Sequence, residues 1–444
     1  MATPNVTINT ISGVLAEFGP EKFVNTVNST SPLLGSGALE KVPQDGEEIV
    51  VPADVGESPS TTYAFDFGTR PVGQTTTPVK ARYVPSIVTS RLSLGKMSAL
   101  AKMADKQLSE MLDYKLDSLA KSAARHVGRG LYGGQVNPQA IFTWSGTAAD
   151  STVTVSFLDV SIFREGAAYD YVNATNTLSY VVRVLNVTPA AVGANSANVA
   201  GTVTFINDVV NPATSAVVAL GNTTGLTTDI FALRGTFAGF GGSNAVVAGK
   251  RLNNFDDVAG SGATAAFGGI APAALPGWQG QTLALAAAYS QEAMTQFGMR
   301  LLARSGEHFT HVLMNPLVAT AHRIQAGSFG AVYGLTAQPT AQRPMNLTAS
   351  ADKYGDTRNG GLSLGGRPVV VDENCPATIV VFHNKDHFKL GVWQEMEPET
   401  LTENGGIVWT NPTTLSIDSH FTGAMQAYTG KRSAIGVVTG LTNM

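Results

Sequence analysis

The sequence has little charge, one cysteine and no long apolar run. Charged residues make up 14% of the 444 residues, and the formal net charge is −4. Globular proteins usually contain about a quarter charged residues, so this share is low. The slightly negative net charge excludes a general polycationic surface that would bind nucleic acid. The single cysteine, Cys375, excludes an intrachain disulfide and a thiolate cluster for zinc or iron–sulfur.

The N-terminus shows no targeting signal. It reads MATPNVTINTISGVLAEFGPEKF and lacks the basic region and apolar core of a signal peptide. No window approaches the roughly 18–20 uninterrupted apolar residues of a membrane span. We therefore expect a soluble protein that is made in the cytoplasm and does not contact a membrane.

What is abundant instead is glycine, with 47 residues, along with Thr, Asn, Ala and Val. Disorder requires high charge and few apolar residues, and this composition does not fit it. The composition suits β-rich structure, loops, and a surface covered by neighbouring subunits rather than by water.

The first 94 residues predict an arm followed by a hairpin. Residues 1–43 contain one short helical candidate and little core of their own. Residues 44–94 contain short β-type runs at 48–51, 61–67 and 79–90, separated by Pro and Gly as in a long hairpin. A hairpin with so few apolar residues is not stable alone.

Charges in this hairpin are segregated along the chain. The acidic residues come first and the basic ones follow: Asp45, Glu47, Glu48, Asp54, Glu57 and Asp66, then Arg70, Lys80, Arg82 and Arg91. One interpretation is that two solvated strands of opposite charge pair with each other. The other, favoured by the hairpin's weak core, is a projecting arm that contacts complementary surfaces on neighbouring subunits.

Residues 95–134 carry the strongest helical pattern in the chain. Apolar residues recur at threes and fours in one narrow stripe: Met97, Ala101, Ala104, Leu108, Leu112, Leu116, Leu119 and Ala123. We expect a helix of about thirty residues, ~45 Å long, that ends at Gly128.

Residues 138–280 differ in composition from the rest. Runs such as STVTVSF and GTVTFINDVV alternate apolar and polar residues and predict a small all-β unit inserted between helical parts. The last part of this range, GSGATAAFGGIAPAALPGWQG, resembles a loop or linker.

The remainder mixes helices and strands. Residues 281–304 predict a second helix, and HFTHVLMNP predicts a buried strand that stops at Asn315-Pro316. A short helix closed by Gly327, several strands and a final helix-to-strand segment, GAMQAYTGKRSAIGVVTGL, follow. Because the spacing is not that of regular βαβ units, the predicted fold class is α+β rather than doubly wound.

Two glycine motifs invite a chemical interpretation. Residues 128–133 match G-x-G-x-x-G, but that fingerprint must open a helix after a strand, and here it closes one. Residues 361–365 match G-x-S-x-G around Ser363, but a polar loop precedes the serine and a strand follows it. We expect a helix end and a turn, respectively.

The spacing of the histidines does not indicate a metal-binding or catalytic site either. His308 and His311 lie three apart on an expected strand and would point to opposite faces. His383 and His387 flank an expected turn and would need a third ligand to hold a metal. We therefore predict no catalytic, cofactor-binding or metal-binding residues, and no enzyme activity.

The order of parts is more informative than any motif. An arm, a charged hairpin and a long helix are followed by three segments, HVLMNPLVATAHRIQAG, LSLGGRPVVVDENCPATIVVFHNKDHFKLGVW and HFTGAMQAYTGKRSAIGVVTGL. In this order, the parts resemble those of tailed-bacteriophage major capsid proteins of the Hong Kong 97 fold. The resemblance covers roughly 1–135 and 281–444. Residues 138–280 depart from the family pattern and look like an inserted accessory domain.

The resemblance implies a domain for each segment. It makes 1–43 an N-terminal arm, 44–94 an extended loop, 95–137 a peripheral domain with a spine helix, 281–390 an axial domain, and 391–444 a return to the peripheral domain. The charged hairpin residues would then contact neighbouring subunits, adding specificity more than affinity.

The resemblance also implies partners. The chain would form hexamers and pentamers of an icosahedral head and enclose double-stranded DNA without sequence-specific binding, as a virion component assembled in the host cytoplasm. A separate scaffolding protein and a portal would be partners, and a decoration protein is a further candidate. No cofactor is expected.

Two other functions compete with the phage shell. One is a cellular nanocompartment shell of the same fold that encloses a cargo enzyme. The other is a hydrolase with a β-rich binding domain, built on Ser363 or on His383 and His387.

Overall fold

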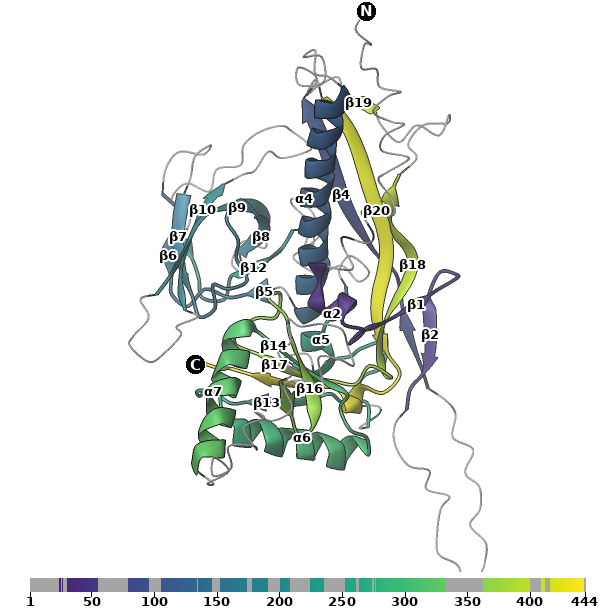
Figure 1. Ribbon diagram of the computed structural model, residues 1–444, viewed down its shortest axis with the longest axis vertical. Helices are drawn as coiled ribbons and strands as arrows, with labels where there is room; N and C mark the ends of the chain where they lie inside the picture. The colour runs from purple at the N-terminus through teal and green to yellow at the C-terminus, as the bar shows by residue number, and fades with distance from the viewer. Residues whose placement is uncertain are drawn as a thin grey trace, which may run out of the picture.

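The computed structural model describes most of the chain, in separate stretches. These are residues 31–54, 79–95, 105–133, 135–145, 152–173, 178–190, 200–207, 224–234, 252–260, 263–273, 277–332, 362–399, 409–411 and 416–442, with positions 24, 26, 30 and 275. The fold is α+β, as predicted, with several sheets and few helices among these residues (Figure 1).

A long helix lies along a long sheet and gives this part of the molecule its elongated form (Figure 1). The helix is α4, Asp105–Tyr132. The five-stranded sheet consists of β1 (Glu40–Pro43), β18 (Phe388–Pro398), β20 (Ser416–Thr429), β19 (Trp409–Asn411) and β4 (Ser86–Gly95). Val88 and Leu92 on β4 are buried in the same hydrophobic core as Leu116 and Ala123 of the predicted helical stripe.

The predicted end of this helix at Gly128 is wrong, because α4 continues to Tyr132. A Cβ on Gly128 would lie 2.9 Å from Asn374 Nδ2, so this glycine allows close approach to a neighbouring turn instead of ending the helix. Gly133, with φ +115°, is the residue that stops it. The first part of the predicted helix, residues 96–104, lies outside the described residues.

A second sheet forms the centre of the body, with a helix pair on one side (Figure 1). Its six strands, in order, are β13 (Gln281–Ala284), β21 (Gly436–Thr439), β17 (Val380–His383), β14 (His311–Met314), β16 (Arg367–Val371) and β15 (Ser363–Leu364). The helices are α6 (Gln291–Ser305) and α7 (Pro316–Val332). Alternation along β14 sends Val312 and Met314 into the core shared with α6, and Leu313 into the core shared with α4.

Three sequence predictions fail in this part of the chain. The predicted helix 281–304 begins only at Gln291, where Ser290 caps it, because residues 281–284 pair with β21 as a strand. The helix expected to close at Gly327 runs on to Val332. The final segment has no α-helix before its strand: β20 runs to Thr429, paired with β18 to its end and with β4 up to Met425, and only the short 3-10 helix η2 (Arg432–Ala434) precedes β21.

A third sheet stands beside the long helix as a separate unit (Figure 1). Its six strands, in order, are β5 (Gln135–Val136), β12 (Ile230–Leu233), β8 (Ala168–Asn173), β9 (Leu178–Pro189), β10 (Gly201–Asn207) and β7 (Thr152–Phe157), and the pair β6 (Phe142–Thr143) and β11 (Thr224–Gly225) adjoins it. Its core is aromatic, with Phe157, Phe205 and Phe231 in mutual ring contact.

Residues 252–280 do not belong to this β-sheet unit, although the sequence predicted one unit over 138–280. Phe255 and Val258 on α5 (Phe255–Ala259) are buried in the core of α4 and the five-stranded sheet, and so is Trp278 from the segment expected to be a linker. Likewise the final strand β21 lies in the central sheet with residues 281–390, and not beside α4 as expected for 391–444.

A buried arginine fixes the 252–280 segment to the C-terminal part of the chain. Arg432, in the short 3-10 helix η2 (Arg432–Ala434), is completely buried. Its guanidinium donates to the carbonyls of Asp257, Val258 and Ala265 at 2.7–2.8 Å and lies over the Phe267 ring at 5.2 Å. Burial lowers the pKa of Arg432 to about 10, so the group remains a cation at neutral pH.

Arg432→Met should destabilise the protein strongly. It leaves buried carbonyls without a donor, and the loss should be about 3–5 kcal/mol, seen as a lower Tm by circular dichroism. Arg300→Met, on the exposed side of α6, serves as the control and should change the Tm little. Equal Tm values for the two variants would contradict this role for Arg432.

Candidate functional site

The sequence motifs that invited a chemical interpretation take structural roles in the described residues. Gly128 and Gly130 lie within the last turns of α4, at the end where the helix dipole disfavours an anion. Ser363 is exposed on β15, and the glycines after it, Gly365 and Gly366, have φ of +58° and +76° in a turn that leads into β16. The first motif does lie at a helix end, although the helix stops at Gly133 and not at Gly128, and the expected turn lies at Gly365 and Gly366, after Ser363.

The histidines are dispersed among different partners. His383 is buried, and its Nε2 lies 2.8 Å from the Ala38 carbonyl, whereas His387 contacts the Glu307 carboxylate. His311 lies on β14 and His308 is exposed before that strand. Within the described residues, no group of three His, Cys, Asp or Glu side chains could hold a metal ion. No helix in the described part of the chain is long and apolar enough to cross a membrane.

The base of the hairpin is the place where predicted site residues gather. The strands β2 (Ile49–Pro52) and β3 (Lys80–Tyr83) pair as a two-stranded antiparallel sheet. Ile49, Ala81 and Tyr83 point inward and are buried in the main core. The inward face therefore holds the hairpin on the body, and the outward face is left for other contacts.

Four of the predicted charged residues have partners within the chain. Arg82 forms an ion pair with Glu48 at 2.8 Å across the hairpin, as the first interpretation of the segregated charges expects. Arg91 pairs at 2.5 Å with the buried Asp418, and Asp54 pairs at 3.1 Å with Lys431. Asp45, Glu47 and Lys80 are exposed, while Glu57, Asp66 and Arg70 lie outside the described residues.

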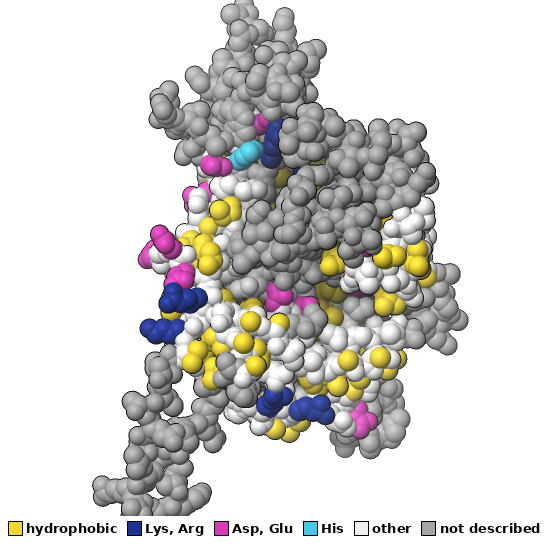
Figure 2. Space-filling view, turned by 180° about the vertical axis from the view of Figure 1, so that it is seen from behind, with side chains coloured by type: hydrophobic (Ala, Val, Ile, Leu, Met, Phe, Trp, Pro, Cys, Tyr) yellow, Lys and Arg dark blue, Asp and Glu magenta, His cyan; other side chains and the backbone are white. Residues whose placement is uncertain are grey.

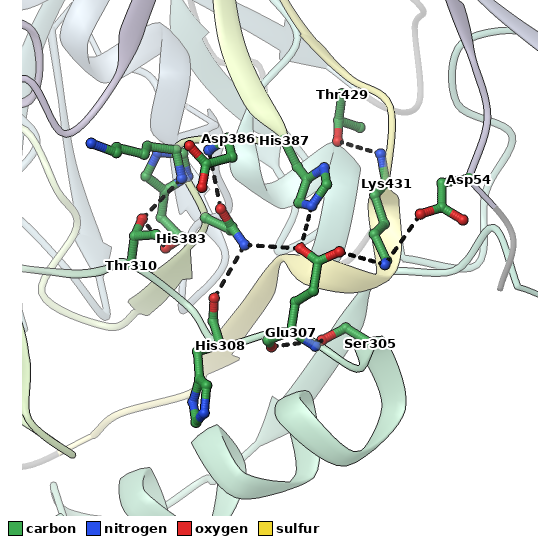
Figure 3. Close-up of polar contacts among 12 residues, drawn as sticks. Asp54, Ser305, Glu307, His308, Thr310, His383, Asp386, His387, Thr429 and Lys431 are labelled. Atoms are coloured by element: carbon green, nitrogen blue, oxygen red, sulfur yellow. Dashed lines mark hydrogen bonds and ion pairs between the residues drawn. The ribbon is translucent and has the colours of Figure 1, made fainter. Parts of the chain in front are cut away.

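A polar network at Glu307 joins the hairpin to two other parts of the chain (Figure 3). Lys431, which follows β20, donates to Glu307 at 2.7 Å and also pairs with Asp54, two residues after β2. The other Glu307 oxygen contacts His387 and lies 3.5 Å from Asn384 Nδ2, both in the turn before β18. One lysine thus connects the hairpin base, the α6–β14 loop and the C-terminal segment.

The charge states in this network are mutually stabilised. Partial burial alone would raise the pKa of Glu307, but hydrogen bonds from Lys431 and His387 outweigh it and hold that pKa below its usual value. Burial would lower the pKa of Lys431, but its two carboxylate partners raise it instead. Glu307 and Lys431 were not among the predicted site residues, because nothing in the sequence near either of them indicates a partner in a distant segment.

A second polar junction connects the β-sheet unit to the body. Asp159, which is buried after β7, accepts hydrogen bonds from the backbone N–H groups of Ala377 and Thr378 at 2.7 and 3.3 Å. Its other oxygen accepts from the backbone N–H and hydroxyl of Ser161. Burial raises the pKa of Asp159, and these hydrogen bonds only partly oppose that rise.

Comparison with known proteins gives structural neighbours only. No known protein family and no curated protein matches the sequence. Among solved structures, the chain is similar to a subunit of the cyanophage A-1(L) capsid asymmetric unit, at 11% identity and TM-score 0.47 over 93% of each chain. It is also similar to the capsid of an empty GTA particle, at 10% identity and TM-score 0.42 over 92% of this chain and 89% of that one.

A further neighbour is a virus-like particle from Pyrococcus furiosus. The identity is 8% and the TM-score 0.34, over 94% of this chain and 96% of the other.

Lys431→Met should loosen the hairpin base. The substitution leaves Asp54 and Glu307 without their shared cation, and we expect a loss of about 1–2 kcal/mol because Lys431 is mostly buried. Hydrogen exchange should quicken at the backbone amides of Ala53 and Asp54, which bond to Val79 and Gly430. Lys121→Met, which removes an exposed ion pair on α4, should leave that exchange unchanged. Unchanged exchange in Lys431→Met would show that the network does not hold the hairpin.

Acid should destabilise the protein through buried histidines. Burial lowers the pKa of His311 to about 4 and that of His383 to about 3, from an ordinary 6.5. Because the unfolded chain binds protons that the folded chain does not, this stability is present above pH 6.5 and is lost as the pH falls toward 4. Urea unfolding from pH 7 to 4.5 should show this decline.

The decline should be shallower in His383→Gln, whose amide N–H can still reach the Ala38 carbonyl. His308→Gln, at an exposed position, should show the wild-type slope. An identical slope in all three proteins would rule out His383 as a source of the decline.

Proposed function

We propose that the chain is a major capsid protein of a tailed bacteriophage, a structural subunit that assembles into hexamers and pentamers around double-stranded DNA. The observation that carries the proposal is the hairpin base. It is a two-stranded sheet whose strands pair with none of the three larger sheets in the described residues, and it carries exposed apolar side chains.

Several exposed apolar side chains lie on or next to β2, β3 and β4: Val50 on β2, Val79 just before β3, Val84 just after β3 and Ile87 on β4. Val50, Val79, Val84 and Ile87 are 40–66% exposed. Val50 lies directly opposite Arg82, and Val84 follows Arg82 by two residues, so Val50 and Val84 occupy diagonal positions on one face. Exposed apolar residues grouped in this way are typical of interaction surfaces.

A second copy of the chain is the partner that this surface fits best. Arg82 and Arg91 pair within the chain, but Asp45 and Glu47 before β2 and Lys80 on β3 are exposed, so the hairpin base presents charges of both signs for a complementary contact. A head-to-tail contact between identical subunits closes into a ring when the rotation between them allows it. Rings of this kind are the capsomers of the proposed shell.

The low charge of the chain fits the same role. Figure 2 shows one face on which hydrophobic and uncharged side chains predominate in the described part, with the few charged groups mainly toward its margins. Such a surface suits burial against neighbours. The net charge of −4 also suits a wall that encloses DNA without binding it tightly.

We also propose that the β-sheet unit is an accessory domain, held on the body by the Asp159 junction. A separate scaffolding protein and a portal would complete assembly in the host cytoplasm, and the product would be a virion. In this role the chain has no enzyme activity and binds no cofactor.

Ile87→Asp should abolish or strongly reduce assembly while leaving the subunit folded. Its side chain is 66% exposed, so a carboxylate there costs the monomer little but would be buried without a partner in the assembled contact. Negative-stain microscopy and mass measurement give the assembly state, and circular dichroism gives the fold.

Leu185→Asp is the matched control, because Leu185 is exposed on β9 of the β-sheet unit. It should assemble like the wild type. Shells formed equally well by Ile87→Asp would overturn the role of the hairpin base, and a wild type that stays monomeric under all assembly conditions would overturn the shell. Hydrolytic activity lost in Ser363→Ala would favour an enzyme instead.

A further inference from the structure

A small cavity lies where the β-sheet unit meets the end of α4. It measures about 10 Å³ and is lined by residues from three parts of the chain: Arg129 of α4, Ile162, Tyr169 and Leu233 of the β-sheet unit, and Asn374 and Pro376 of the turn after β16. A volume of this size holds one water-sized group. Apart from Arg129, Tyr169 and Asn374, the lining is apolar.

Arg129 is a buried cation whose hydrogen bonds are incomplete. The residue is only 6% exposed, and its Nη1 donates to the Tyr169 hydroxyl at 2.8 Å. Its Nε and Nη2 have no acceptor among the described residues. Burial lowers the pKa of Arg129, but a guanidinium stays protonated in proteins. A buried charge with unmet donors is costly, so this site calls for an additional acceptor.

The charges around Arg129 do not balance. Arg125 and Arg164 lie 3.6 and 3.3 Å from the same carboxylate, that of Glu373, and their Nε atoms are also buried without an acceptor among the described residues. Glu373 pairs with Arg125 and Arg164 and also acts electrostatically on Arg129, so this one carboxylate is shared by three cations.

The nearby buried carboxylates have other donors. Asp159 accepts from Ser161, Ala377 and Thr378, whereas Asp372 accepts from Tyr132 at 3.1 Å and from Asn374. Their oxygens are therefore occupied by donors other than Arg129.

We propose that this cavity binds one monatomic anion, of which chloride is the ordinary cellular example. The anion would accept from the free donors of Arg129. The C-terminal end of α4 disfavours a negative charge there, so the attraction of the Arg129, Arg125 and Arg164 cations must outweigh that repulsion. Because the lining comes from α4, the β-sheet unit and the 372–376 turn, the bound anion would hold the β-sheet unit on the body. The competing occupant is a water molecule, which could also donate to Asn374 Oδ1, an acceptor that lacks a partner among the described residues.

The first test uses bromide, which replaces chloride and can be identified by anomalous scattering. Crystals of the full chain soaked in sodium bromide should show an anomalous peak against the Arg129 guanidinium. Density for a water without an anomalous peak, or a peak that appears only at molar bromide, would overturn the proposal.

The second test measures stability against halide at constant ionic strength and protein concentration. As sodium chloride replaces sodium gluconate, the Tm of the wild type should rise by about 1–3 °C and follow the logarithm of the chloride concentration. Arg129→Gln should show no such rise, and Arg164→Gln, which only reduces the excess charge, should need several-fold more chloride for the same rise.

Lys121→Gln provides the control for general salt effects. It removes one positive charge from an exposed position on the same helix and should keep the wild-type chloride response. An equal chloride response in Arg129→Gln, or none in the wild type, would refute the site. The bromide peak in the wild type tests the proposal even if Arg129→Gln fails to fold.

Discussion

The turn formed by residues 372–378 must satisfy buried polar groups that reach it from three directions. Tyr132, at the end of α4, donates to Asp372, and Asn315, which precedes α7, donates to the Cys375 carbonyl at 2.7 Å. Asp159 of the β-sheet unit accepts from Ala377 and Thr378. Since unmet buried groups are costly, the long helix, the central sheet and the β-sheet unit are each fixed in position by this one turn.

Small residues make that meeting point geometrically feasible. Gly128 allows α4 to approach Asn374 at a distance that a Cβ would obstruct, and Ala377 presents its backbone N–H to Asp159. Two glycines of the motif that resembles a nucleotide-binding fingerprint therefore have structural roles. Gly128 permits close packing, and Gly133 ends the helix. The chemistry of the motif depends on where it lies relative to a strand and a helix.

The hairpin base relies on a different kind of contact. Its inner side packs by apolar burial, while Lys431 connects Asp54 to Glu307 near the surface. Asp54 and Glu307 are partly exposed, so these ion pairs add only modestly to stability, but they join the hairpin base to two other segments. A segment attached in this manner keeps its direction while its outer apolar face stays available to another copy of the chain, which is what the proposed shell contact requires.

Local patterns in the sequence determined much of the secondary structure. The apolar stripe predicted the middle of α4, alternation predicted β7 and β10, and Asn315-Pro316 predicted the end of β14, because each signal depends on neighbours along the chain. The class of fold and the hairpin followed from the same patterns.

Only the tertiary structure decided the remaining features, because they depend on partners that are distant in sequence. Residues 281–284 and 423–429 have helix-like composition but are strands, since paired edges are present beside them. Arg432 binds carbonyls about 170 residues away, and Lys431 finds Glu307 and Asp54 from two further segments. Charge and hydropathy along a chain indicate that such groups need partners, but the three-dimensional fold selects which partners they meet.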